Sequence, residues 1–209
     1  MSSLWARKIS VVRKPRVERM FRKSMESTVV LDREPATALN KGDDRGGKYL
    51  VFHLGREDFA IRVLKVREIM GIQDITAVPQ TPVYVKGVIN LRGKVIPVVD
   101  LRLKFGLPEQ EYTQRTCIIV VQVRVEGGPT LMGIVVDGVA EVLNLAVTDI
   151  EDTPDFGDGT STPYLLGMAK VKGNVKILLD IEQVLTNQEL HGLGASMQPD
   201  NLQEEKGGI

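Results

Sequence analysis

Short apolar runs rich in β-branched residues alternate with turn-forming residues along most of the chain. From Lys48 onward the turns recur about every eight to twelve residues, a rhythm typical of barrels and sandwiches. Expected strands are residues 49–54, 59–61, 67–70, 85–91, 95–99, 116–125, 130–136, 164–171 and 175–180. Residues 181–190 predict a short C-terminal helix that ends before Gly192. Because no long helix separates the strands, the pattern predicts an all-β fold and excludes a parallel α/β sheet.

The strongest local signal is the stretch VKGVINLRGKVIPVVDLRL at residues 85–103. Two apolar runs meet at Leu91-Arg92-Gly93, where the glycine can supply the positive φ of a tight hairpin turn. Pro97 has no amide to donate, so its strand is expected at a sheet edge or beside a bulge. Asp137-Gly138 is a second hairpin signal. Arg92 at the tip is either a solvated turn residue or part of a binding surface.

Charge separates the first residues from the rest. Residues 1–48 carry twelve Lys/Arg and six Asp/Glu, and the remainder carries fifteen and twenty-one. Residues 1–47 are expected to be a basic, flexible extension, either a disordered tail or an arm that contacts an acidic partner or anionic lipid. A short amphipathic helix after Pro15 is possible within it. Residues 191–209 are expected to form a flexible polar tail.

The chain offers little chemistry for catalysis. Its two histidines, His53 and His191, are far apart, and no Ser-His-Asp, Cys-His or zinc-type spacing appears. Cys117, the one cysteine, is expected to pack as a small hydrophobe. Acidic residues 149–159 lack the spacing of a calcium loop, and no phosphate-binding glycine loop is present. No metal, cofactor or catalytic residue is therefore predicted, and the chain is expected not to be an enzyme.

No secretory signal or apolar stretch long enough to cross a membrane is visible, so a cytoplasmic protein is expected. Aromatic residues make up 5% of the chain, which disfavours a stacking platform for single-stranded nucleic acid. A nucleic-acid-binding barrel with a basic arm stays a remote alternative. A small-ligand or enzymatic barrel is disfavoured by the missing site.

Eight short motifs resemble the CheW family, the adaptors of bacterial chemotaxis. They are YLVF at 49–52, FAI at 59–61, LKVREI at 64–69, KGVINLRG at 86–93, VIPVVDL at 95–101, GIVVDGV at 133–139, YLLG at 164–167 and ILLD at 177–180. The resemblance covers about residues 48–190. It implies two SH3-like, five-stranded β-barrel subdomains with a short C-terminal helix.

The resemblance also implies a function. CheW-like proteins bind the helical cytoplasmic tips of chemoreceptors and the regulatory domain of the histidine kinase CheA, so the chain is expected at receptor arrays on the inner face of the membrane. It would associate with that membrane only through receptors and would bind no nucleic acid. A scaffold for non-flagellar motility or another kinase pathway is the alternative.

The positions that match receptor-contacting residues are Val63, Val66, Glu68, Arg92, Val135 and Val136. Val66 and Val136 would form an apolar floor, and Arg92 would bind a carboxylate or helix-end carbonyl. Glu68 would pair with a receptor cation or orient Arg92. Taken singly, the valines are better explained as barrel core and Glu68 as a solvated strand residue. Kinase contacts are expected in the other barrel, within residues 120–137, with no individual residue assigned.

Overall fold

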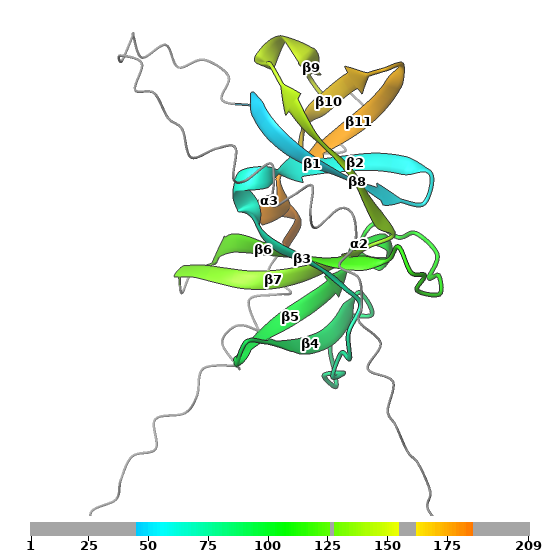
Figure 1. Cartoon of the computed structure of the whole chain (residues 1–209), viewed down its shortest axis with the longest axis vertical. Coiled ribbons are helices and arrows are strands. Elements are labelled where there is room, and N and C mark those ends of the chain that lie inside the picture. Colours follow the sequence, from blue (N-terminus) through cyan, green and yellow to red (C-terminus); the bar gives the residue numbers. More distant parts are fainter. Residues whose placement is uncertain (1–44, 126–127, 155–161, 186–209) are drawn as a thin grey trace, which may run out of the picture. The chain divides into compact units, whose positions relative to one another are not determined.

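The computed structural model describes residues 45–125, 128–154 and 162–185, and these form two β-sheets (Figure 1). The helix expected after Pro15, most of the basic extension, and the tail lie outside the described residues. So does the second half of the predicted C-terminal helix, of which α3 (Ile181–Leu185) is described.

The first sheet has six strands in the order β8-β1-β2-β11-β10-β9. Their bounds are β1 Gly47–Leu54, β2 Glu57–Arg62, β8 Gly138–Leu145, β9 Ile150–Glu151, β10 Leu165–Val171 and β11 Asn174–Leu179. The second sheet has five strands in the order β3-β6-β7-β5-β4. Their bounds are β3 Val66–Gly71, β4 Val85–Leu91, β5 Lys94–Asp100, β6 Cys117–Val125 and β7 Gly128–Val136.

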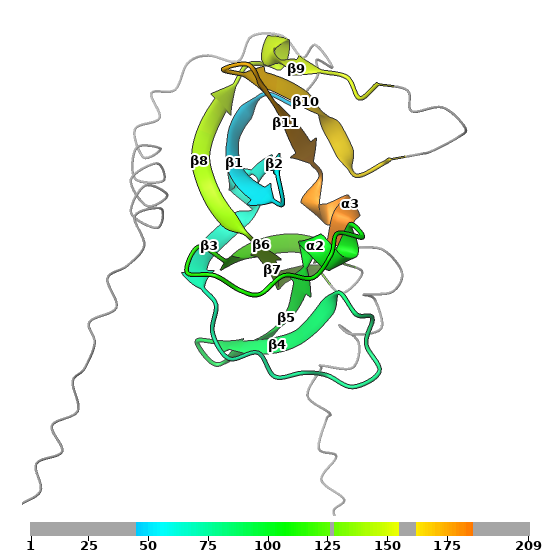
Figure 2. The same cartoon turned by 90° about the vertical axis from the view of Figure 1, so that its right-hand side faces the viewer.

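Short helical turns connect these strands or follow the last of them. They are the 3₁₀ turns η1 (Val63–Lys65) and η2 (Val147–Asp149) and the short helices α2 (Leu101–Lys104) and α3. Strands β3 to β7 all belong to the five-stranded sheet, and the strands before and after them to the six-stranded sheet. The chain therefore passes between the sheets twice, at η1 and at Asp137, and α2 and α3 lie between the two groups of strands (Figure 2).

The two sheets repeat one design. In each sheet, the second strand of an antiparallel pair lies parallel to the second strand of a hairpin. These parallel neighbours are β2 and β11 in one sheet and β7 and β5 in the other. The hairpins β4–β5 and β10–β11 correspond residue for residue, 80 positions apart. The amide of Asp100 donates to the carbonyl of Tyr84 at 2.7 Å, and that of Asp180 to Tyr164 at 2.8 Å. Each aspartate then begins the short helix that follows its hairpin, α2 or α3.

A corresponding glycine occurs early in each hairpin. Gly87 has φ 134° and Gly167 has φ 146°. A Cβ on Gly87 would lie 2.0 Å from the carbonyl oxygen of Thr76, and one on Gly167 would lie 2.6 Å from that of Glu151. Both positions therefore need glycine for the close approach of a neighbouring backbone as well as for φ.

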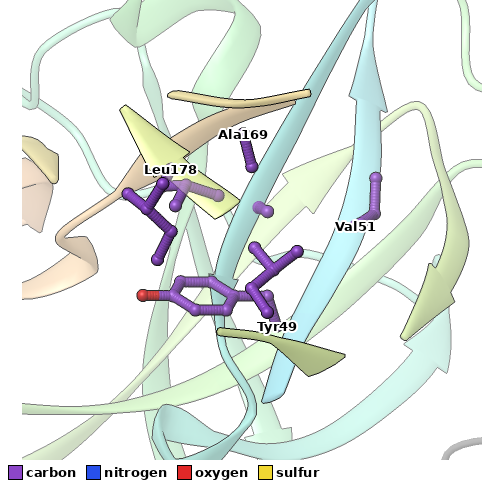
Figure 3. Packing of buried hydrophobic residues seen from close by; sticks show 7 residues of the cluster. Tyr49, Val51, Ala169 and Leu178 are labelled. Carbon is purple, nitrogen blue, oxygen red and sulfur yellow. The ribbon is translucent and has the colours of Figure 1, made fainter. Parts of the chain in front are cut away.

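Each sheet surrounds its own apolar core. In the six-stranded sheet, Tyr49, Val51, Ala169 and Leu178 are fully buried and gather in one cluster (Figure 3). The five-stranded sheet buries a second cluster, comprising Ile89, Ile96, Val98, Ile118, Val120 and Val135. Full burial of one such aliphatic side chain contributes about 1.5–3 kcal/mol, so each core stabilises its own sheet.

A row of stacked aromatic rings joins the two subdomains. Phe52, Phe59, Phe105 and Tyr164 follow one another with centroids 6.1, 5.7 and 5.8 Å apart. Phe105 follows α2 of the five-stranded subdomain, and the other three rings belong to the six-stranded one. The prediction of two barrel-like β subdomains is confirmed, with the two-residue β9 as a sixth strand beside the five longer ones of its sheet.

The hairpin at Arg92 is confirmed, because β4 pairs with β5 up to Leu91 opposite Lys94. Of the two positions expected for Pro97, the sheet edge is wrong, since β5 lies between β7 and β4. The position beside a bulge is confirmed, because the β4–β5 pairing shifts register between Val85 and Gly87, opposite Val99 and Val98. Pairing with β7 begins at Val98, so the missing amide of Pro97 lies just outside that ladder.

The hairpin expected at Asp137-Gly138 is also wrong. Strand β8, which the apolar pattern did not predict, pairs with β1 of the other sheet instead of β7. Both sides of β7 are already occupied by β6 and β5, so β8 has no free edge to join there. Helix α2 was not expected either. It starts because the carboxylate of Asp100 accepts the amides of Arg102 and Leu103 at 2.9 and 3.3 Å.

Candidate functional site: a charged hairpin tip

The β4–β5 turn presents Arg92 on a rigid support. Arg92 has φ 53° and Gly93 has φ 85°, the positive values that a two-residue hairpin turn requires. The side-chain oxygen of Asn90 accepts a hydrogen bond from the amide of Gly93 at 2.8 Å, which stabilises the turn. Because the backbone is held, the position of the arginine at the tip is set by the hairpin.

Glu68 orients the Arg92 side chain. Arg92 Nη2 lies 2.9 Å from Glu68 Oε1, with the arginine side chain 79% exposed and the glutamate 28%. Glu68 lies on β3, whereas the turn joins β5 to β4 at the far end of the same sheet. The ion pair therefore bridges the two outer strands of the sheet. Four of the five donor hydrogens of a guanidinium remain for a partner when one is used here.

The predicted apolar floor has almost no exposed surface. Val63, Val66, Val135 and Val136 are 7%, 2%, 2% and 0% exposed. Val135 belongs to the core of the five-stranded sheet. The structure therefore brings Glu68 and Arg92 together at the surface and places the valines behind them, as packing. A receptor role for the valines stays a prediction, whereas their packing role is visible.

The segment expected to contact the kinase lies in the same sheet as Arg92. Residues 120–125 belong to β6 and residues 128–136 to β7, both in the five-stranded sheet. The expectation that this segment belongs to the other barrel is wrong. The sequence showed no sign of this, because strand order depends on pairings between distant residues.

The six-stranded sheet has a corresponding tip. Lys172 has φ 53° and Gly173 has φ 82°. Lys172 Nζ lies 4.0 Å from Glu141 of the outer strand β8, with the lysine side chain 81% exposed. Two tips therefore share one backbone, and they differ in the cation and in how closely it approaches its glutamate. Sequence analysis missed this repeat, although the spacing of 80 residues between Arg92-Gly93 and Lys172-Gly173 signals it.

Charged residues also meet inside the six-stranded sheet. Asp58 contacts Lys176, and its other oxygen lies 2.5 Å from Nδ1 of His53. Burial raises the pKa of the Asp58 carboxyl, but hydrogen bonds and positive charge from Lys176 and His53 outweigh it and lower the pKa overall. His53 and Lys176 are thus both bound to Asp58 within the fold.

One further candidate for chemistry, Cys117, can be placed. Cys117 is buried, as predicted, and burial raises its pKa to about 11, so its thiolate is scarce at neutral pH. Residues 45–125, 128–154 and 162–185 contain no group of three or more His, Cys, Asp or Glu suited to a metal ion. No helix in that part of the chain is long and apolar enough to span a membrane.

Two β-barrel subdomains built on one repeated plan, with an exposed charged hairpin tip, define the class of protein: a double-barrel β protein. Comparison with known proteins gives the family: residues 48–189 match the model described as the CheW-like domain. The chain belongs to the CheW-like family, which confirms the resemblance seen in its motifs.

Individual relatives agree with this assignment. The chain is 40% identical over 149 residues to "Chemotaxis protein CheW" of Klebsiella aerogenes, covering 71% of this chain and 87% of that protein. It is 35% identical over 145 residues to "Chemotaxis protein CheW" of Rhizobium meliloti, covering 69% and 91%. Its structure is similar to the scaffolding protein TtCheW from Thermoanaerobacter tengcongensis, with TM-score 0.60, 30% identity and coverage of 69% and 95%.

Proposed function

We propose that this chain is a non-enzymatic adaptor that couples chemoreceptors to the histidine kinase CheA. The observation that carries the proposal is the Arg92–Glu68 pair on a rigid turn, at the two receptor-contacting positions that the family resemblance implies and that lie at the surface. Membership of the CheW-like family supports a chemotaxis scaffold in general. The protein would act in the cytoplasm, at receptor arrays.

The chemistry of the tip suits a helical partner. A chemoreceptor tip is a helical hairpin, so it offers carboxylates on its faces and carbonyl groups at its helix ends. Arg92 can bind either, because a guanidinium forms two parallel hydrogen bonds to one acceptor group. The ion pair with Glu68 already restricts the arginine side chain, so less side-chain entropy is lost on binding.

The adaptor role needs a second surface for the kinase. Since residues 120–136 share a sheet with Arg92, a kinase that binds the other barrel would contact the six-stranded subdomain instead. One protein would then present one subdomain to each partner. No catalytic group is needed for this, because the function consists of holding the receptor and the kinase in a fixed relative position.

The decisive experiment reverses the charge at the tip. Arg92→Glu should weaken binding of a receptor cytoplasmic fragment by at least about tenfold, because the cation is lost and an acid faces Glu68. Lys172→Glu is the matched control, since Lys172 has the same φ of 53° and similar exposure on the other tip. The control should bind receptor like the wild type.

The same variants should be tested for coupling. CheA autophosphorylation is measured with receptor-containing membranes from the same genome, with and without the protein. The wild type should raise kinase activity and Arg92→Glu should not, while urea unfolding shows both to be folded. Normal receptor binding and coupling by Arg92→Glu would overturn the proposed site, and no effect of the wild type would overturn the adaptor function.

A further inference from the structure

One ion pair ties the sheets together where the chain passes from the five-stranded to the six-stranded sheet. Arg102, in α2, lies with Nη1 2.5 Å from Oδ2 of Asp137, the residue at the crossing. The same carboxylate oxygen accepts the amide of Gly55, in the β1–β2 turn of the six-stranded sheet, at 2.6 Å. The Arg102 side chain is only 8% exposed, and its Nε donates to the carbonyl of Pro108 at 3.2 Å. We name this contact the first clasp.

A second ion pair lies at the other crossing. Lys65, in η1, lies with Nζ 2.8 Å from Oε1 of Glu182 in α3. The same oxygen accepts the amide of Arg124, near the end of β6 in the five-stranded sheet, at 3.1 Å. The two side chains are 33% and 24% exposed. We name this contact the second clasp.

The two clasps correspond under the internal repeat, with the charges exchanged. Arg102 and Glu182 are 80 positions apart, and each is the second residue of the helix that follows its hairpin. In each clasp one carboxylate oxygen contacts a cationic side chain. The same oxygen also accepts a hydrogen bond from a backbone amide in a strand or in the turn between two strands. In the first the helix supplies the cation and the crossing the acid, and in the second these roles are reversed.

We propose that the two clasps hold the five-stranded and six-stranded subdomains in one fixed orientation, so that the chain acts as a rigid spacer between partners bound to each. The stacked aromatic rings supply attraction between the subdomains, but stacking tolerates sliding and tilting. Charge-assisted hydrogen bonds demand particular distances and angles. The clasps therefore supply the precision that the aromatic row lacks.

The exchange of charges makes the arrangement selective. Helix α2 carries an arginine and helix α3 a glutamate. Asp137 would therefore meet the like charge of Glu182 on α3, and Lys65 the like charge of Arg102 on α2. A wrongly docked arrangement would leave like charges together, which is disfavoured. Breaking one clasp should therefore raise the proportion of misoriented subdomains by roughly tenfold, the scale of coupling between contacting charged residues.

The orientation itself can be measured without any partner. Spin labels are placed at Lys94→Cys and Asn174→Cys, exposed and corresponding positions on β5 and β11, in a chain carrying Cys117→Ala. With both clasps intact, the distance between the two labels should have one narrow distribution. In Lys65→Glu that distribution should be broader or shifted. Lys86→Glu is the matched control, because Lys86 forms a 2.8 Å pair with an acid of its own subdomain.

Restoring the charge pair should restore the orientation. Lys65→Glu combined with Glu182→Lys should narrow the distance distribution again, and Lys65→Gln should broaden it less than Lys65→Glu. An unchanged distribution in Lys65→Glu would overturn the proposal, and so would a distribution broadened equally by the Lys86→Glu control. Urea unfolding identifies any variant that fails to fold, in which case Lys65→Gln decides.

The consequence for signalling rests on the proposed adaptor function. Lys65→Glu should bind an isolated receptor fragment as tightly as the wild type, since the Arg92 tip is untouched, yet should lose about tenfold in kinase activation by receptor. Loss of fragment binding to the same extent would point to general damage and overturn the spacer role. Failure of the adaptor function would appear separately, as no kinase activation by the wild-type protein, while the label distances would still decide the clasps.

Discussion

Removal of the Asp58 carboxylate should strongly destabilise the six-stranded subdomain. Its partner Lys176 is 6% exposed and lies on β11, directly opposite Asp58 of β2. In Asp58→Ala the ammonium group would stay buried without its counter-charge. It would then have to lose its proton or draw water into the sheet, and both cost free energy.

The structure sets the size of the effect. Removing one partner of a buried ion pair costs about 3–5 kcal/mol. The Asp58 side chain keeps 18% exposure, so some water can reach the site, and the lower figure of about 3 kcal/mol applies. Domains of this size are stable by about 5–15 kcal/mol, so the loss would be a large fraction of the total. With a typical denaturant slope the urea midpoint should fall by about 1.5 M.

The internal repeat supplies the control. Ile96 lies 80 positions before Lys176, and Leu131 is found by counting back from the Val98–Gly133 pair as Asp58 is counted back from Leu178–Ala60. Both side chains belong to the apolar cluster of the five-stranded sheet. An apolar pair is therefore compatible with this backbone. The double variant Asp58→Leu with Lys176→Ile should be within about 1 kcal/mol of the wild type or more stable, since apolar replacement of a buried pair is often neutral or stabilising.

The assay is urea unfolding at pH 7 of the wild type, Asp58→Ala, Lys176→Ile and the double variant, followed by circular dichroism. We expect a large loss of stability for Asp58→Ala and recovery in the double variant, which is strongly non-additive behaviour. Two results would refute it: a neutral Asp58→Ala, or a double variant that loses the sum of the two single losses. The second result would mean that shape, and not charge, decides the site.

Three further outcomes follow from the same contacts. Because the folded pKa of Asp58 lies below its reference value of 3.8, its stabilisation is fully present well above that value and is lost as pH falls through the folded pKa. Acid titration of unfolding should therefore show a smaller loss for Asp58→Ala than for the wild type. Cys117 should resist alkylation in the folded protein and react only when urea unfolds it, because burial raises its pKa to about 11; fast native-state modification would contradict this. Gly87→Ala should lose about 3 kcal/mol or more, since its Cβ would meet the Thr76 carbonyl oxygen at 2.0 Å. Gly93→Ala, with nothing within 4 Å of its Cβ, should lose only about 1 kcal/mol in the same unfolding assay.

The features that sequence predicted well are those fixed by neighbouring residues. The hairpin at Arg92 depends on two apolar runs and a glycine in the right place, and its turn is where the pattern put it. The start of α3 likewise follows from the aspartate before it, whose carboxylate accepts the amides of the first turn. Local turn and cap chemistry can be read from neighbouring residues. It was not read everywhere, since the equivalent cap of α2 by Asp100 was missed.

The features that sequence missed depend on distant residues. Strand β8 pairs with β1, about 90 positions earlier, and no local rule distinguishes this from a hairpin with β7. Burial of Lys176 could not be foreseen either, because lysines are rarely buried without a partner and the partner is 118 positions away. The same limit applies to the clasps, whose four charged residues lie in four separate segments. At the candidate tip, the orientation of Arg92 by Glu68 was one of two roles expected for the glutamate, and the two side chains meet. The valines are buried, which fits the core alternative, and their receptor role stays a prediction.

The repeat also explains why one tip is the better docking candidate although both share a backbone. At the first tip the arginine is held 2.9 Å from its glutamate, and at the second the lysine nitrogen is 4.0 Å away. A planar guanidinium held by one hydrogen bond still presents a defined face to a partner, whereas a loosely held ammonium presents a mobile point charge. Because the same fold carries both, a difference in binding between Arg92→Glu and Lys172→Glu would reflect this chemistry and not the shape of the turn.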